Sequence, residues 1–256
     1  MQEALTMPAL KAVFSFPFQE RNWPSRFLIG AALLVAGYII PIVPVIFVFG
    51  YVVRVLRQAL EGKDLTLPMW DDWGRLGSDG LRAFVVGLVY LLPGTVVYLA
   101  GFAVYIASSY GFFLFTETAS EPSGAALAAP FAYLGGLAIF FLAFLVGTVL
   151  LVLGAIPLPV ALAHATAKDR LGAAFSVREW WPYLRQNRLG YFITWLLVFG
   201  LGQLVNLTSM IIAYTGVCCC LVPLVSAPIY LYLLLVGGGL FGLTYRESVA
   251  IAPAGS

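Results

Sequence analysis

The longest stretch of the chain without any Asp, Glu, Lys, Arg or His runs from Leu189 to Tyr245. It reads LGYFITWLLVFGLGQLVNLTSMIIAYTGVCCCLVPLVSAPIYLYLLLVGGGLFGLTY. At about 1.5 Å per residue it would form roughly 85 Å of helix, nearly three times the thickness of a bilayer's hydrocarbon core. The stretch must therefore fold back on itself, and residues 214–216 provide the turn. We predict two membrane crossings here, near Leu189–Ala213 and Cys218–Leu243.

Three more stretches lack ionisable side chains and are long enough to cross a bilayer: Phe27–Val53, Ala83–Thr116 and Pro122–Ala163. The chain is 61% hydrophobic and 10% charged, against about half and a quarter in soluble proteins. We therefore predict an all-α, polytopic membrane helix bundle with about five hydrophobic segments. The expected organisation is an interfacial tail (1–26), one transmembrane domain (27–245, with further crossings near Ala83–Ala107 and Pro130–Leu153) and a C-terminal tail (246–256).

The distribution of basic residues predicts the orientation. All 14 Lys and Arg lie in the N-terminal tail, in two connectors or at Arg246. The only charged residues in segment 108–129 are Glu117 and Glu121, and the turn at 214–216 contains no charged residue. Because short basic loops stay in the cytoplasm, both basic connectors and the C-terminus are expected on the cytoplasmic side of a multi-pass inner membrane protein.

The segment Phe27–Val53 has two interpretations. A single crossing would leave the three basic residues of the N-terminal tail outside, whereas a re-entrant hairpin would keep all 14 basic residues inside. Pro41 and Pro44 divide the segment into short arms, which suits a hairpin of half the membrane's depth, but proline-kinked complete spans also occur. Both interpretations stay open at this point.

An offset of 108 residues aligns the two basic connectors with each other. The matched pairs are Asp71/Glu179, Trp73/Trp181, Leu76/Leu184, Asp79/Asn187, Leu81/Leu189 and Phe84/Phe192. Each copy follows a proline-broken apolar segment and precedes a full span. We predict a parallel internal repeat with halves 27–107 and 130–213, followed by the final span 218–243, unlike the inverted halves of many transporters.

The first connector is the most distinctive stretch, with candidate interfacial or head-group contacts at Trp70, Asp71, Asp72, Trp73 and Arg75. Carboxylates here could hold a divalent ion or a cationic head group, with arginines taking phosphate. The structural alternative has the tryptophans as interfacial anchors and the aspartates at the start of a short surface helix, with an N-cap for the next span at Ser78 or Asp79.

The second connector repeats this pattern of aromatic and charged residues at Glu179, Trp180 and Trp181, which are further candidate contacts. We therefore predict two amphipathic elbows on the cytoplasmic face.

Few polar side chains fall within the spans. Gln203 and Asn206 share one helix face and are candidate intramembrane contacts, either bonding a neighbouring helix or lining a polar pocket. His164 is the only histidine and favours a capping or interface role. Cys218, Cys219 and Cys220 point in divergent directions on a helix, so packing is the default and a redox or acylated thiol the alternative. No motif indicates catalytic, cofactor-binding or metal-binding residues.

Several motifs in order resemble a known family: Trp23, Pro41, Gly50-Tyr51 with Arg54, Leu67-Pro68, Trp70-Asp71-Asp72-Trp73, Gly80-Leu81, and Tyr90 with Pro93. They are similar to the prokaryotic membrane proteins grouped as domain of unknown function, number 4013. The resemblance extends from about Phe14 to Tyr245 and is looser in the second half, where Ala174-Phe175 and 187–191 match. It implies a prokaryotic cytoplasmic membrane and supplies no catalytic residues.

These observations favour a non-enzymatic membrane protein that acts as a subunit, scaffold or lipid-organising factor. Its expected partners are membrane lipids and other membrane proteins or further copies of itself, and its net charge of +2 argues against nucleic acid. The alternative is a small-solute or lipid transporter with a pocket between the two halves, near Gln203 and Asn206. A weaker third hypothesis is a lipid-modifying enzyme that uses Asp71 and Asp72.

Overall fold

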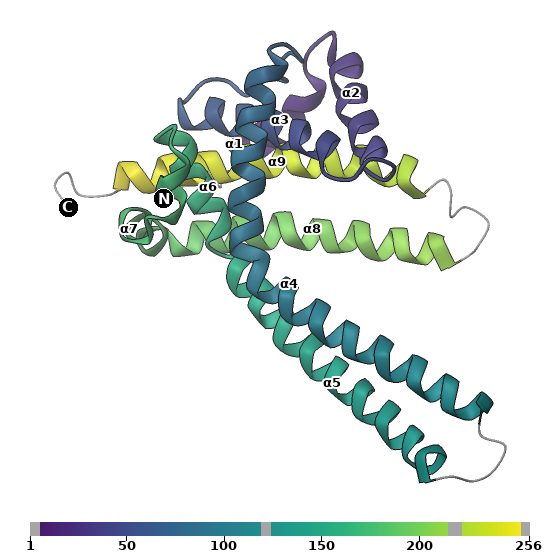
Figure 1. The fold of residues 1–256 in the computed structure, drawn as a ribbon. Helices are drawn as coiled ribbons and strands as arrows, with labels where there is room; N and C mark the ends of the chain where they lie inside the picture. Colours follow the sequence, from purple (N-terminus) through teal and green to yellow (C-terminus); the bar gives the residue numbers. More distant parts are fainter. Residues whose placement is uncertain (1–5, 119–123, 215–221, 252–256) are drawn as a thin grey trace. The chain divides into compact units, whose positions relative to one another are not determined.

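All regular secondary structure in the described parts of the chain is helical (Figure 1). The structure is a computed structural model that describes residues 6–118, 124–214 and 222–251. Its elements are α1 (Met7–Ser15), η2 (Phe16–Phe18), α2 (Trp23–Ala36), α3 (Val43–Leu60), α4 (Trp73–Thr118), α5 (Gly124–Ala155), α6 (Leu158–Ala167), η3 (Leu171–Phe175), α7 (Val177–Gln186), α8 (Arg188–Tyr214) and α9 (Val222–Ile251).

Five of these helices, α3, α4, α5, α8 and α9, are long and apolar enough to cross a membrane. The predicted all-α polytopic bundle with about five hydrophobic segments is therefore confirmed. Helix α8 ends at Tyr214, at the predicted turn. The rest of that turn, together with Cys218, Cys219 and Cys220, lies outside the described residues.

Helix α4 begins ten residues before the predicted span at Ala83, because Asp72 caps it. The Asp72 carboxylate accepts the backbone N–H of Arg75 at 3.1 Å, and the positive φ of 47° at Asp72 turns the chain into the helix. The prediction of an N-cap at Ser78 or Asp79 is therefore wrong. Both residues lie inside the helix, where the Ser78 hydroxyl donates to the carbonyl of Arg75.

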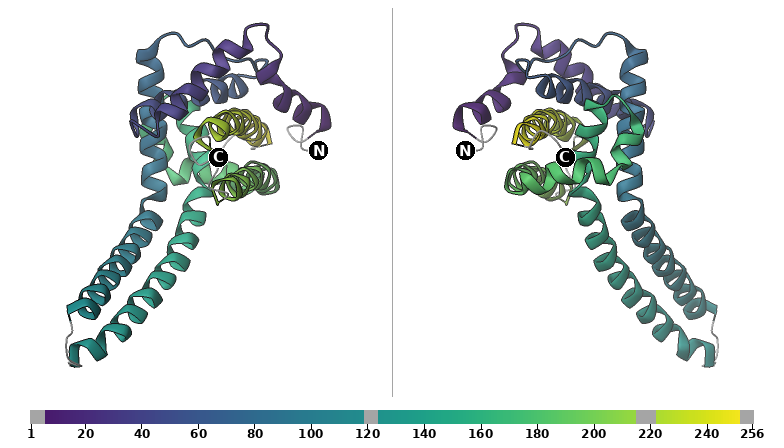
Figure 2. Two further views of the ribbon diagram at one scale, coloured as in Figure 1. Left: turned by 90° about the vertical axis from the view of Figure 1, so that its right-hand side faces the viewer. Right: turned by 90° about the vertical axis from the view of Figure 1, so that its left-hand side faces the viewer.

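The chain divides into two compact units, one formed by Gly87–Leu158 and the other by the segments before and after it. The first is an antiparallel hairpin of α4 and α5 (Figures 1 and 2). Its helices meet along small residues: Gly94 faces Gly147, Gly101 faces Ala143, and Ser108 faces Gly136. Small side chains let two apolar helices approach closely in lipid, where burial of apolar area supplies no driving force. The outer surface of the hairpin is largely apolar and exposed.

In the other unit, α9 is the central helix and packs against α2, α3 and α8. Figure 2 shows α8 and α9 nearly end-on and adjacent, and Thr194 and Thr244 join them through a buried hydroxyl pair at 3.1 Å. The main core contains Phe27, Tyr51 and Leu231, from α2, α3 and α9. Half of the most apolar window of α9 is buried, as expected for a helix that is surrounded by protein rather than lipid.

Helices α3 and α4 cross at two glycines. A Cβ at Gly50 would overlap the backbone of Leu76, and a Cβ at Gly80 would overlap the carbonyl oxygen of Ile46. Only glycine permits backbones to approach this closely. The crossing holds the start of α4 against α3 and thereby positions the charged residues of both helices.

Candidate functional site

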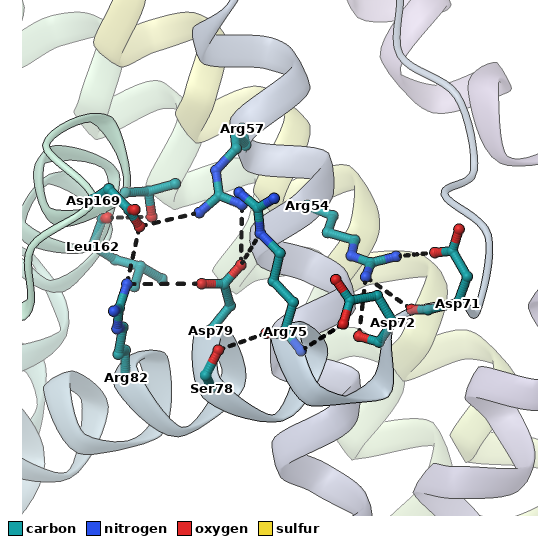
Figure 3. Close-up of polar contacts among 11 residues, drawn as sticks. Arg54, Arg57, Asp71, Asp72, Arg75, Ser78, Asp79, Arg82, Leu162 and Asp169 are labelled. Carbon is teal, nitrogen blue, oxygen red and sulfur yellow. Dashed lines mark hydrogen bonds and ion pairs between the residues drawn. The ribbon is translucent and has the colours of Figure 1, made fainter.

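The candidate site is the first connector and the charged residues that surround it on α3 and α4 (Figure 3). Arg54 on α3 binds the connector through several hydrogen bonds. Its guanidinium donates to the carbonyl oxygens of Met69 at 2.9 Å and Asp71 at 2.8 Å, and to the Asp71 carboxylate at 2.6 Å. This hydrogen-bonded guanidinium holds the pKa of Asp71 below its ordinary value. Arg54 thus fixes an otherwise extended segment.

Aromatic stacking and α2 complete the hold on the connector. The ring of Trp70 stacks on that of Tyr51 with centroids 4.1 Å apart, and the Tyr51 hydroxyl donates to the carbonyl of Pro68 at 2.8 Å. The Trp70 indole donates to the carbonyl of Arg26 at 2.7 Å, and the Arg26 guanidinium donates to the carbonyl of Leu67. Residues 67–71 are therefore bonded to the start of α2 and to the second half of α3.

Asp79 forms the second part of the site and is only 5% exposed. Its carboxylate accepts from the guanidinium of Arg57 at 3.0 Å, while Arg75 and Arg82 lie 3.9 Å away. Arg82 also binds Asp169 at 2.9 Å, and Arg57 lies 3.7 Å from the same carboxylate. A buried carboxylate needs such partners because an unpaired charge in a low dielectric is very unfavourable.

A cavity of about 20 Å³ lies among Arg57, Asp79, Arg82, Thr166 and Asp169. It has room for about one water molecule. Within the described ranges, no three His, Cys, Asp or Glu side chains converge as metal ligands. The arrangement is that of an ionic clamp between α3, α4 and the loop after α6, with Arg75 and Arg82 still partly exposed.

The second connector has its own polar network around His164. Its Nε2 lies 3.2 Å from the Glu179 carboxylate and its Nδ1 lies 2.7 Å from the Tyr245 hydroxyl. Since a carboxylate can only accept, Nε2 carries the proton, and Nδ1 of the neutral ring accepts from Tyr245. The hydrogen bond from His164 is the main reason that the pKa of Glu179 is lowered. The network ties α7 to α6 and α9.

The two connectors use comparable contacts. In each, a carboxylate binds a side chain on the preceding helix: Asp71 binds Arg54, and Glu179 binds His164. The matched residues Asp79 in the first connector and Asn187 in the second are both buried. The first connector, however, is extended where the second contains a helix, α7. The internal repeat stays a prediction.

The structure brings together most of the residues that the sequence singled out. Asp72 binds the backbone N–H of Arg75, and the rings of Trp70 and Trp73 stack with their centroids 5.7 Å apart, so the candidate residues of the first connector lie together.

In the second connector, Trp181 is 52% exposed, but Trp180 is only 2% exposed. The Trp180 indole donates to the carbonyl of Ala174 at 3.0 Å, so Trp180 packs inside the elbow and does not reach the surface as predicted. Gln203 and Asn206 are exposed on α8, and neither lines the cavity beside Asp79.

Sequence reasoning missed most of the partners of this cluster. Arg54 was noted only within a motif, and Arg57, Arg82 and Asp169 were not noted as partners. The available signal was the spacing of Arg54 and Arg57, three residues apart on one face at the end of an apolar helix. Asp169 comes from a distant connector, and nothing in the local sequence associates it with α3 or α4.

The comparison with known families agrees with the motifs at this site. Residues 33–214 match the family described as "Protein of unknown function (DUF4013)". The chain belongs to this family. The matched range includes Gly50, Arg54, Asp71 and Gly80, so the helix crossing and the contacts of Arg54 with the connector lie within it, whereas Arg26 precedes it. No curated protein and no solved structure matches the chain.

Proposed function

We propose that this member of the family is a non-enzymatic membrane protein that organises lipid in one leaflet of a prokaryotic cytoplasmic membrane. In this proposal α2 and α3 form a re-entrant hairpin that enters the bilayer and returns to the same side. The supporting observation is that the two ends of the apolar segment 27–53 are bonded to one five-residue stretch, 67–71.

The contacts at the ends of the segment favour re-entry over crossing. Arg26 immediately precedes the apolar segment and binds Leu67, while Arg54 immediately follows it and binds Met69 and Asp71. These partners lie within five residues of one another in the first connector. A segment that crossed the bilayer would hold its ends about 30 Å apart.

The lengths of the arms suit half of a bilayer. From Phe27 to Ala36, α2 would rise about 15 Å, and from Val43 to Val53, α3 would rise about 16 Å. Each length is near half of the roughly 30 Å hydrocarbon core. Helix α3 is long enough to span only when the two turns that contain Arg54 and Arg57 are included, and these residues bind the connector.

The composition of the turn between the arms also supports a location in hydrocarbon. The tip, residues 38–43, reads Tyr-Ile-Ile-Pro-Ile-Val, and all six residues are exposed, with Ile39 82% exposed. Turns that face water are usually built from Gly, Asn, Asp and Ser. An exposed apolar tip is stable where its surroundings are lipid. With re-entry, all 14 basic residues lie on the cytoplasmic side, as the positive-inside rule prefers.

Cysteine labelling tests this topology in the full chain, with Cys218, Cys219 and Cys220 replaced by Ser. Asn22→Cys and Asp64→Cys should react with a membrane-impermeant maleimide on the same side of the membrane. Glu121→Cys should react on the opposite side, and Ile39→Cys on neither. Reaction of Asn22→Cys on the side of Glu121→Cys would mean that the segment crosses, and the proposal would be abandoned.

A second experiment addresses the effect on lipid. A hairpin inserted in one leaflet adds area to that leaflet alone, so protein oriented with the hairpin in the outer leaflet should reduce vesicle diameter as its density rises. Ile39→Asp/Ile40→Asp should lose this effect, because acidic side chains are costly in hydrocarbon. Ile39→Ala/Ile40→Ala is the matched control and should retain it. An unchanged diameter with the wild-type protein would contradict the lipid-organising role and leave the topology to the labelling result.

A further inference from the structure

A groove of about 400 Å³ lies between α2, α3 and α9 on one side of the hairpin. Its eight lining residues are Leu34, Gly37, Tyr38, Val45, Phe49, Ala227, Tyr230 and Leu234. Apart from the two tyrosine hydroxyls, the lining side chains are apolar. The groove is separate from the ionic clamp, since none of its lining residues belongs to the clamp.

The location of the groove identifies the medium that fills it. All eight residues belong to the charge-free stretches 27–53 and 189–245. The neighbouring tip residues Ile39, Ile40 and Ile42 are all more than half exposed, so the rim is apolar as well. A concave apolar surface in such surroundings faces lipid chains and not water.

The size of the groove distinguishes between lipid and protein as its occupant. Specific protein interfaces use about 20–30 residues on each side, far more than eight. A helix with side chains is about 10 Å across and would need a longer and wider channel than 400 Å³ provides. A volume of this size lies within the range of sites for small ligands. A single flexible hydrocarbon chain fits both the small number of lining residues and the volume of the groove.

We propose that this groove binds one acyl chain of a membrane phospholipid. The inference rests on the proposed function only in requiring that the hairpin lies in the bilayer. The proposal adds a specific ligand class, and it places that ligand at a site that holds lipid for longer than the exposed apolar surface of the α4–α5 hairpin does. Phe49 and Leu234 would contact the chain, and the absence of a side chain at Gly37 leaves room for it.

Photocrosslinking and lipid retention together test the proposal. The full-length protein is reconstituted in vesicles of phosphatidylethanolamine and phosphatidylglycerol that contain a trace of phosphatidylcholine with a diazirine on its acyl chain. After illumination, peptides that cover 34–49 and 227–234 should carry the most label. After exchange into mild detergent, native mass spectrometry should find one phospholipid on each chain.

Val45→Phe should fill the groove, lower labelling of these peptides at least tenfold and abolish the retained lipid. Ala227→Val is a second variant, in case Val45→Phe disturbs folding, because it adds less volume to the groove than Val45→Phe does. Val96→Phe, on the exposed surface of α4, is the matched control and should change neither measurement.

Three results would overturn the proposal. These are equal labelling of the groove and of the outer surface of α5, a lipid still retained by the well-folded groove variants, and crosslinking of a second protein chain at the groove. The cysteine-labelling result distinguishes a failure of the groove proposal from a failure of the proposed function. A re-entrant pattern without retained lipid rejects only the groove, whereas a crossing pattern rejects the proposed topology.

Discussion

Replacing Arg57 by Met removes the closest partner of a buried carboxylate. Asp79 is 5% exposed, and among the residues that the structure describes Arg57, at 3.0 Å, is its only hydrogen-bonded ion-pair partner, since Arg75 and Arg82 lie 3.9 Å away. Breaking a buried pair from one side costs roughly 3–5 kcal/mol. The two remaining guanidinium groups offset part of this, so we expect a loss of about 3 kcal/mol in the free energy of unfolding, the lower end of that range.

The measurement is reversible unfolding in mixed detergent micelles, followed by far-ultraviolet circular dichroism. Arg75→Met is the control, because Arg75 is 57% exposed and its contact with Asp79 is long, so it should cost no more than about 1 kcal/mol. Arg57→Met/Asp79→Leu should recover most of the loss, since replacing both partners of a buried pair by apolar groups is often close to neutral. Equal losses for Arg57→Met and Arg75→Met, or a double variant less stable than Arg57→Met, would refute the reasoning.

Three further predictions concern packing and pH. Gly80→Ala should destabilise the protein by about 1–3 kcal/mol or prevent folding, because its methyl group would overlap the backbone of α3. Gly87→Ala should be tolerated, because a Cβ there meets open space. Unfolding titrations of the two variants test this difference. Tyr51→Phe should cost about 1 kcal/mol in the same titration by leaving the carbonyl of Pro68 without its hydroxyl donor, and an unchanged free energy would contradict it. Because His164 lowers the pKa of Glu179, that pair stabilises the fold above about pH 4.5, the ordinary pKa of the carboxyl, and this stabilisation is lost as pH falls through the lowered pKa. Glu179→Gln should remove this loss of stability at acid pH. An identical profile of stability against pH in wild type and variant would contradict the prediction.

The sequence predicted the helical membrane class because the charge-free stretches are long and the charges are confined to the connectors. The positions of α5, α8 and α9 follow from the same pattern. The start of α4 does not follow from this pattern, because residues 73–82 contain three charged side chains and therefore fall outside the charge-free stretch. Those charges are paired within the fold: Asp79 is buried and binds Arg57 of α3, and Arg82 binds Asp169 in the loop after α6.

The candidate site was only half predictable for a related physical reason. Trp70, Asp71 and Trp73 are local neighbours, so their clustering follows from the connector alone. The role of Asp169 depends on tertiary packing that brings residues 87 positions apart within 2.9 Å, and no local pattern encodes it. Trp180 was misassigned because tryptophan suits both an interface and a core, and only the carbonyl of Ala174 decides between them.

The base of the proposed hairpin is bonded to the first connector from both of its arms. A re-entrant hairpin has no anchor on the far side of the membrane, so its orientation depends entirely on contacts at its base. Arg26 and Arg54 supply these contacts from the two arms, and both bind backbone carbonyls of the connector. A crossing helix would not need two such contacts to one short stretch, because each of its ends would be held by a different interface. The convergence of both arms on residues 67–71 is therefore better explained by re-entry than by a span.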